Sequence, residues 1–451
     1  MEPETQTYTD MFSNEINAQV TDEQESGDNK IEDEEYAFTY PTYNCEKPWT
    51  HVCGSIKEFE TVKTQGFLKG CKWSPDGTCL LTCADDNVMR LYDLPASFYQ
   101  YRDKAFDGID LPELTPSLRI KEGELVYDFC WHPHMSSWKP ETLASTSKNG
   151  PIHFWDAYKG NLAATYRAYN NVDEVEAAYS LCISPDGEKL LTGFNKCVRI
   201  FHINRPGREC STISTKSSDI LTASQSGIIS CLAVNPGLPS VYAAGSYMKS
   251  IGLYSEQDGT SLCVLEGHKG GVTHITFSPD GLMLYSGGRK DPEIICWDLR
   301  NPGCVLFIMK RTVDTNQRIY FDLDPSGRYL ISGETSGLAQ IWDTQIGLEM
   351  KASEDPLTTI LPAFAQTRAH SDCTNGISCH PWLPLIATSS GQRHVTPLFD
   401  RASFDSDDEG NETDETFIPK TRENSVKLWW VGKSADDLVI RNASPVAHSV
   451  D

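Results

Sequence analysis

The chain has 451 residues, 15 cysteines and a formal net charge of −24 at pH 7. It holds no apolar run of the roughly 20 residues that span a bilayer, and its acidic start lacks the basic and apolar regions of a signal peptide. We therefore expect an intracellular protein with reduced thiols and no membrane segment. No Cys-x-x-Cys pair supports a zinc site, and the negative charge disfavours sequence-blind nucleic-acid binding.

The N-terminal segment carries much of the negative charge. Met1–Tyr40 holds twelve acidic residues and a single basic one, Lys30. Such a segment cannot bury enough apolar surface to offset the entropy of ordering. Residues 1–45 are therefore predicted to be a disordered acidic tail. The run His51–Phe59 follows and has the pattern of a strand.

A strand followed by a proline turn then recurs seven times. The residues two and four positions before each turn proline are all apolar or cysteine, which predicts a strand with one buried face. Proline ends each strand because it lacks the ladder donor, and glycine in the turn accepts positive φ. The turn prolines are Pro75, Pro133, Pro185, Pro236, Pro279, Pro325 and Pro381.

An aromatic residue recurs on the third predicted strand of every repeat. These residues are Tyr92, Trp155, Phe201, Tyr254, Trp297, Trp342 and Trp429. A period of about 40–45 residues with four strands is the signature of WD repeats. The sequence therefore predicts an all-β fold, a seven-bladed WD-repeat β-propeller over residues 46–435, with a flexible tail over residues 436–451. The last repeat ends at its third strand, Lys427–Val431, so His51–Phe59 is predicted to supply the missing fourth strand.

The fifth repeat contains residue types that could suggest a hydrolase. It holds His268, Ser286, Asp291 and Trp297. Each occupies the place at which WD repeats have a buried hydrogen-bond network, and no Gly-x-Ser-x-Gly elbow accompanies them. We interpret the four as structural and predict no catalytic site, no metal and no cofactor.

Cations recur in the loops between the second and third strands, which open on one face of a propeller. Together with aromatic residues they predict a surface for single-stranded RNA, because cations pair with phosphates and aromatic rings stack on bases. Lys69 and Arg318, just before first strands, are expected on the same side. The other predicted contacts are Lys148, Lys196, Tyr247, Lys249, Arg289, Lys290, Arg393 and His394.

An acidic insertion interrupts the last blade at about residues 400–423. Asp400–Thr416 holds eight acidic residues and a single basic one, Arg401. Because it leaves from the predicted cationic face, it could cover the cations and compete with RNA; deleting Asp405–Glu415 would then tighten RNA binding at low salt. The acids that follow Ser406 also make it a candidate phosphorylation site.

Longer strings are more specific than the repeat pattern. They are Phe67–Trp73, Asn149–His153, Ser226–Cys231, Arg289–Asp291, Thr315–Asp322, Asp372–Gly376 and Ala387–Arg393. Through these strings the chain resembles the telomerase Cajal body protein family, from about Trp49 to Val431. The acidic tail and the acidic insertion also match, although the tail is short for this family.

The resemblance implies a specific function. Its members bind the Cajal-body localisation box of H/ACA small Cajal-body RNAs and, where it exists, of telomerase RNA. They direct these particles to nuclear Cajal bodies, support telomerase assembly, contact dyskerin-type H/ACA proteins and fold with the cytosolic chaperonin. We expect the same of this chain, as a monomer with a cytoplasmic folding stage. The alternative is a scaffold for proteins that does not read RNA directly.

Overall fold

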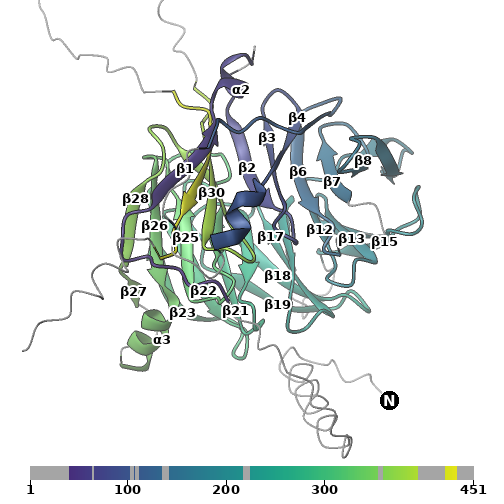
Figure 1. The fold of residues 1–451 in the computed structure, drawn as a ribbon. Coiled ribbons are helices and arrows are strands. Elements are labelled where there is room, and N and C mark those ends of the chain that lie inside the picture. The colour runs from purple at the N-terminus through teal and green to yellow at the C-terminus, as the bar shows by residue number, and fades with distance from the viewer. Residues whose placement is uncertain are drawn as a thin grey trace, which may run out of the picture.

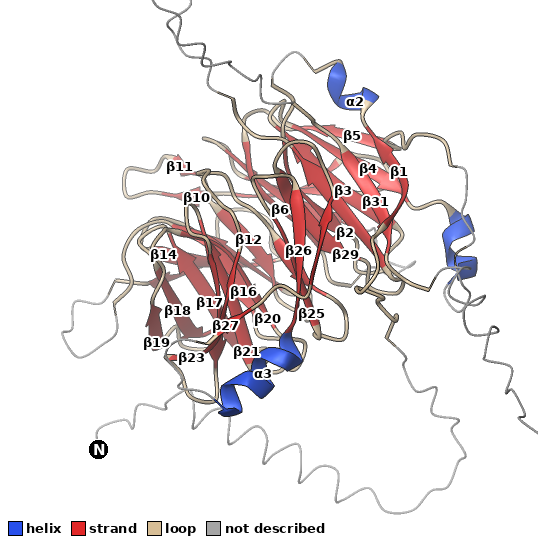
Figure 2. Cartoon of the chain, turned by 90° about the vertical axis from the view of Figure 1, so that its left-hand side faces the viewer, coloured by secondary structure: helices blue, strands red, loops and turns tan. Residues whose placement is uncertain are grey.

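Seven sheets stand side by side as the blades of a closed ring (Figures 1 and 2). The computed structural model describes residues 40–62, 65–101, 106, 111–134, 142–216, 224–353, 359–394 and 422–433. Consecutive strands within each blade are antiparallel neighbours, and the first strand of the repeat is innermost in the ring. The prediction of a seven-bladed propeller is confirmed.

The first four blades each contain four strands. The first comprises β2 (Leu68–Trp73), β3 (Cys79–Ala84), β4 (Val88–Asp93) and β5 (Leu118–Lys121). The second comprises β6 (Val126–Trp131), β7 (Thr142–Ser147), β8 (Ile152–Asp156) and β9 (Leu162–Tyr166). The third comprises β12 (Ser180–Ile183), β13 (Lys189–Gly193), β14 (Cys197–His202) and β15 (Ser211–Ser214). The fourth comprises β16 (Ile229–Val234), β17 (Val241–Ser246), β18 (Ser250–Ser255) and β19 (Ser261–Glu266).

The remaining blades depart more from the simple repeat. The fifth comprises β20 (Val272–Phe277), β21 (Met283–Gly288), β22 (Glu293–Asp298), β23 (Cys304–Lys310) and a parallel fifth strand, β27 (Ile360–Leu361). The sixth comprises β24 (Phe321–Leu323), β25 (Tyr329–Gly333), β26 (Leu338–Asp343) and β28 (Ala365–Arg368). The seventh comprises β29 (Thr374–Cys379), β30 (Leu385–Ser390), β31 (Val426–Trp430) and β1 (Thr50–Ser55).

The other elements lie in loops. They are α2 (Lys57–Glu60), the 3-10 helix η1 (Ala96–Tyr101), α3 (Thr344–Ser353) and the hairpin of β10 (Ala168–Tyr169) with β11 (Val175–Glu176). In Figure 1, α2 marks the upper face of the ring and α3 the lower face. The loops between second and third strands lie on the upper face, and the turns between first and second strands on the lower face. Within the described residues, no helix is long and apolar enough to cross a membrane.

The core lies between neighbouring blades. Of the fourteen positions two and four residues before the turn prolines, all are buried except Val234, which is partly buried. The third-strand aromatics pack in the same clusters, and Trp297 and Trp342 are among the largest fully buried side chains. All fifteen cysteines carry free thiols. Burial raises the pKa of Cys53, Cys71 and Cys231 to about 12, so these thiols act as small apolar groups.

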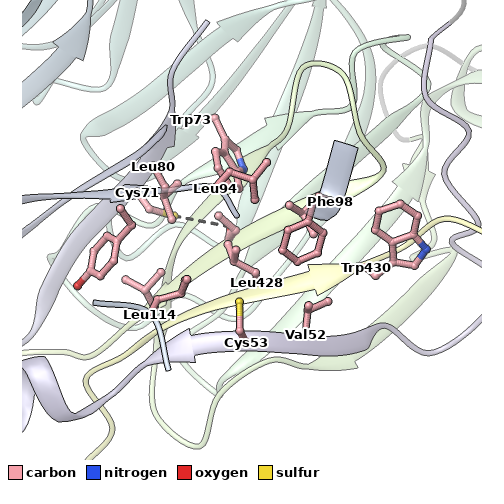
Figure 3. Packing of buried hydrophobic residues seen from close by; sticks show 14 of the residues in the cluster. Val52, Cys53, Cys71, Trp73, Leu80, Leu94, Phe98, Leu114, Leu428 and Trp430 are labelled. Atoms are coloured by element: carbon pink, nitrogen blue, oxygen red, sulfur yellow. Dashed lines mark hydrogen bonds between the residues drawn. The ribbon is translucent and has the colours of Figure 1, made fainter. Parts of the chain in front are cut away.

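The ring is closed by a strand from the other end of the chain. β1 pairs antiparallel with β31, with Cys53 opposite Leu428 and Ser55 opposite Val426. Figure 3 shows Val52 and Cys53 of β1 packed beside Leu428 and Trp430 of β31. The predicted closing strand is thus confirmed over Thr50–Ser55, whereas Lys57–Glu60 forms α2. Tyr43 and Cys45 are also buried, so packed chain begins within the segment 1–45.

Each innermost strand is also tied to its neighbour around the central channel by at least one side-chain hydrogen bond. Because these contacts are buried, each bond also satisfies a polar group that water cannot reach easily. Around the ring they are Lys72 to Phe129 O, Leu181 N to Asp128, Ser180 to Ile229 O, Ser230 to Val272 O, His274 with Phe321 O, Cys379 N to Asp322, and Trp73 N to Ser378.

A second set of bonds links the lower-face turns of three pairs of neighbouring blades. His380 Nε2 donates to Gly77 O at 2.8 Å while its Nδ1 accepts two backbone N–H groups of its own turn. His132 and Asn235 make the equivalent links to Gly187 O at 3.1 Å and Gly281 O at 3.0 Å. Burial lowers the pKa of His380 to about 4, which keeps the ring neutral and able to accept at Nδ1.

Replacing Gly77 by alanine should therefore destabilise the ring. Gly77 has φ +74°, and a Cβ there would lie 2.4 Å from Cε1 of His380. The left-handed backbone costs about 1–2 kcal/mol, and displacing His380 adds roughly 1–3 kcal/mol. Chemical denaturation should resolve the two contributions if Gly303→Ala serves as the control, because Gly303 has φ +93° and a methyl group there would meet no atom within 4 Å. Equal losses for both variants would show that the histidine link contributes nothing.

Candidate nucleic-acid interface

Hydrogen bonds join the four residues expected to form the network of the fifth blade. His268 contacts Asp291 at 2.9 Å through Nδ1 and Ser286 at 2.7 Å through Nε2, and the indole of Trp297 donates to Ser286 at 2.8 Å. All four side chains are buried. The set therefore holds the upper loop of this blade to its second and third strands, and its hydroxyl is not accessible to a substrate.

Two further blades contain networks that the sequence analysis missed. In the seventh blade His370 contacts Glu423 at 2.8 Å and Thr388 at 2.7 Å, and Trp429 donates to Thr388 at 2.8 Å. In the second, Glu122 takes the place of the histidine and binds Ser145 and His153, and Trp155 donates to Ser145. The repeated Trp with Ser or Thr on the adjacent strand was the signal, but glutamate at an unexpected position obscured it.

Three of the predicted lysines occupy a backbone conformation that lysine rarely adopts. Lys196, Lys249 and Lys290 have φ of 63°, 70° and 49°, and all are exposed on upper-face turns. The equivalent turns of the first and second blades place asparagine there, Asn87 and Asn149. Asparagine and glycine fit the left-handed region better than lysine does. Lysine is therefore less favourable than asparagine at these three exposed positions.

Aromatic rings gather near the upper mouth of the channel. Arg289 lies over the ring of Tyr247 at 4.3 Å, and a Cβ at Gly271 would lie within 3 Å of the Tyr247 backbone. Tyr127 and Tyr179 stack with ring centroids 5.5 Å apart and planes at 19°. Burial, Tyr179 and Tyr247 raise the pKa of Tyr127, which places the three tyrosines near one another.

The sequence analysis identified Tyr247 and missed Tyr127 and Tyr179. Both lie at the upper ends of innermost strands and are only partly buried. Their position next to the predicted start of a first strand was the available signal. Partly exposed, stacked phenol rings beside a guanidinium make a surface on which a base can stack.

Arg318 and Lys69 point into the ring. The Arg318 guanidinium pairs with Asp128 at 3.1 Å and donates to Ser230 O at 2.6 Å, so it crosses the channel from the sixth blade to the second and fourth. Lys69 donates to Val126 O at 3.1 Å, and burial lowers its pKa. Both cations are therefore already committed to contacts between blades.

The remaining predicted residues lie at the rim of the upper face. Lys148 and Arg393 are exposed, and the Arg393 backbone N–H donates to Gln317 at 2.7 Å. His394 pairs with Asp372 at 3.0 Å. Ser406 and the acidic stretch Asp400–Thr416 lie outside the described residues. Among the residues that are described, no group of three or more His, Cys, Asp or Glu side chains is arranged to hold a metal ion.

Comparison with known proteins identifies the family. The WD domain, G-beta repeat, matches residues 57–93 and 259–298. Telomerase Cajal body protein 1 of Mus musculus is 46% identical over 403 residues, which cover 88% of this chain and 72% of the mouse protein. The chain belongs to the telomerase Cajal body protein 1 family. The Homo sapiens member is 45% identical over 92% of this chain and 73% of its own length.

Members of this family extend beyond vertebrates. The telomerase Cajal body protein 1 homolog of Drosophila melanogaster is 36% identical over 83% of this chain and 67% of its own length. The resemblance inferred from the sequence strings is thus confirmed. This is a family of WD-repeat propeller scaffolds and not of enzymes.

Proposed function

We propose that this chain is an RNA-binding scaffold that recognises the Cajal-body localisation box of H/ACA small Cajal-body RNAs and of telomerase RNA. It directs the particles to nuclear Cajal bodies and supports telomerase assembly together with dyskerin-type H/ACA proteins. It acts as a monomer, after folding in the cytoplasm with the help of the chaperonin. The names of its relatives support the telomerase and Cajal-body part. The observation that carries the RNA part is the set of exposed left-handed lysines Lys196, Lys249 and Lys290.

The exposed lysines and the aromatic rings have different roles in RNA recognition. Exposed lysines attract phosphates from any sequence and make affinity depend on salt. The three tyrosines lie on the second, third and fourth blades, and Arg289 lies on the fifth. One or two splayed bases of a loop can stack there. Arg393 can form bidentate hydrogen bonds with RNA, a geometry for which arginine is better suited than lysine. A short single-stranded loop is the ligand that fits both.

Replacing Lys196, Lys249 and Lys290 together by asparagine should weaken RNA binding without weakening the fold. Three lost phosphate contacts should reduce the slope of log K against log salt by about 2 for a single strand. Asparagine suits the left-handed backbone, so the melting temperature should stay the same or rise. Fluorescence anisotropy with a labelled loop that bears the localisation box, over a series of salt concentrations, measures the slope.

Lys159→Asn is the matched control, since Lys159 is equally exposed but lies on the turn after β8, on the lower face. It should leave the slope unchanged. An unchanged slope in the triple variant would contradict the proposed interface. If mutations in the localisation box leave the affinity unchanged, the chain does not read that sequence, and the alternative of a scaffold for proteins takes its place.

A further inference from the structure

The central channel contains a cavity below the contacts of Arg318. Arg318 spans the upper part of the channel to Asp128 and Ser230 O. Beneath them a cavity of about 290 Å³ remains among the lower halves of the innermost strands. The Lys72 side chain in this cavity is 29% exposed, so water reaches it. The cavity lies toward the lower face, opposite the proposed RNA surface, because Trp73, Trp131 and Thr276, which line it, stand at or near the lower ends of their strands.

A carboxylate with free acceptor capacity lines the cavity. Asp322 on β24 accepts one backbone N–H at each oxygen, from Cys379 at 2.9 Å and from Leu323 at 2.9 Å. It forms no ion pair within the described part of the chain. Each oxygen of a carboxylate has capacity for a second donor. Asp322 therefore presents unused acceptor capacity to the cavity.

Lys72, the cation in the same cavity, already has partners of its own. Its ammonium group donates to Phe129 O at 2.6 Å and lies 3.6 Å from Asp128. Burial would raise the pKa of Asp128, but Lys72 and Arg318 hold it below its usual value. The two cations and Asp128 thus form one cluster. In the described chain, Asp322 takes part in none of the hydrogen bonds or ion pairs of this cluster.

The approach to the cavity is acidic, and its walls are aromatic. Three lower-face turns carry an exposed or partly exposed aspartate that hydrogen-bonds within its own turn and is in no ion pair of the described chain: Asp76, Asp186 and Asp280. Because these turns follow the innermost strands, they surround the lower mouth. Trp73, Trp131 and Phe321 line the cavity itself. Carboxylates steer a cation to such a mouth, and aromatic faces attract it inside.

We propose that this cavity takes an arginine side chain from a basic peptide segment of a partner protein. The guanidinium donates to the free lone pairs of Asp322 and packs against the aromatic wall, while the lower-face aspartates attract the rest of the segment. Guanidinium suits this place better than ammonium because it is weakly hydrated and stacks on rings. The chain thereby has a protein-binding face opposite its RNA-binding face, and the two do not depend on each other.

Keeping Asp322 has an energetic cost that supports this role. Burial, with a contribution from Asp324, raises its pKa to about 7. An unfolded aspartate ionises at about pH 4, whereas Asp322 in the fold ionises only at about pH 7. The fold therefore loses stability as the pH rises from about 4 to about 7. Charged or titratable groups near Asp322 are Asp324, Lys72, Cys71, Cys379 and Tyr43. A bound cation would remove this cost, as expected of a group retained for binding.

The test uses the full chain and a short labelled peptide of alternating arginine and glycine. Fluorescence anisotropy should show binding to the wild type that strengthens from about pH 6 to about pH 8 as Asp322 ionises. Asp322→Asn should weaken it about 10-fold or more. The same variant should melt at a higher temperature than the wild type at about pH 8 and at a similar one at about pH 4. A glutamine-glycine peptide should not bind.

Two other variants make the result decisive. Asp258→Asn removes an exposed lower-face carboxylate at the outer rim and should leave peptide affinity unchanged. Thr276→Arg places a tethered guanidinium in the cavity and should abolish peptide binding, while binding of the RNA loop stays as in the wild type. Equal losses for Asp258→Asn and Asp322→Asn would reduce the effect to general surface charge and overturn the proposal.

Other ligands give different outcomes. Stabilisation by inorganic phosphate in place of the peptide would assign the cavity to an anion at Lys72 and overturn the proposal. Self-association that Asp322→Asn abolishes would make a second copy of this chain, with its cationic face, the occupant instead. Failure of RNA binding alone would contradict the proposed function and leave this inference standing.

Discussion

Replacing Arg318 by alanine should lower the free energy of unfolding by about 3–5 kcal/mol, because it leaves a buried carboxylate short of a partner. Asp128 is 5% exposed and holds Arg318 at 3.1 Å. The guanidinium also donates to Ser230 O and to the Tyr320 hydroxyl, so the variant removes the link across the channel. Lys72 at 3.6 Å compensates only part of the charge that remains.

Chemical denaturation of a matched set of variants measures this. Arg393→Ala removes an exposed arginine of the upper face and should change the stability by no more than about 0.5 kcal/mol. Arg318→Ala combined with Asp128→Ala should be less destabilising than the two single losses added, since the pair is coupled. A loss below about 1 kcal/mol for Arg318→Ala would show that the channel cluster is solvated and not a structural link.

RNA binding by an Arg318 variant depends on the integrity of the ring as well as on the RNA interface. A loss of RNA binding in Arg318→Ala would follow from damage to the ring, even if the arginine never touches RNA. The exposed residues are the informative ones. Arg393 and the left-handed lysines can lose RNA affinity with the fold intact, so variants of these residues test the interface directly.

The strands and turns of each blade could be predicted because the residues that determine them lie close together in the sequence of each repeat. A turn proline, two apolar positions before it and an aromatic residue on the third strand were enough to place the blades and their buried faces. The closing strand followed from a missing fourth strand after Lys427–Val431. β27 could not be foreseen, because two residues pairing in parallel with β23 leave no periodic signal.

The position of Arg318 could not be predicted for a different reason. The residue precedes a first strand, where the repeat pattern places side chains at the upper face. Its partner Asp128 is 190 residues away, and the two meet only because the ring closes around a narrow channel. The repeat describes each blade but not what faces it across the axis. The lower-face links of His132, Asn235 and His380 also depend on the neighbouring blade, although each stands where a turn lacks serine before its proline.

The second large effect concerns the closure of the ring. Deleting residues 1–56 should prevent stable folding, whereas deleting residues 1–39, for which the sequence predicts no packed structure, should leave the melting temperature unchanged. The longer deletion removes β1 and the buried side chains of Tyr43, Cys45 and Trp49. It also removes the bond from Asn44 N to Val431 O at 2.6 Å and leaves β31 as an unpaired edge.

The expected size follows from the surface that this segment buries. At about 1.5–3 kcal/mol for each large apolar side chain, three or more such side chains amount to at least about 5 kcal/mol. A domain is stable by only about 5–15 kcal/mol, so the loss is comparable with the whole. Circular dichroism melting and size-exclusion chromatography of the two deletions measure it. Aggregation of the longer deletion through the exposed edge of β31 is the expected outcome. If the longer deletion instead stayed monomeric and melted at the same temperature as the shorter one, the seventh blade would be stable with three strands and β1 would not be needed to close the ring.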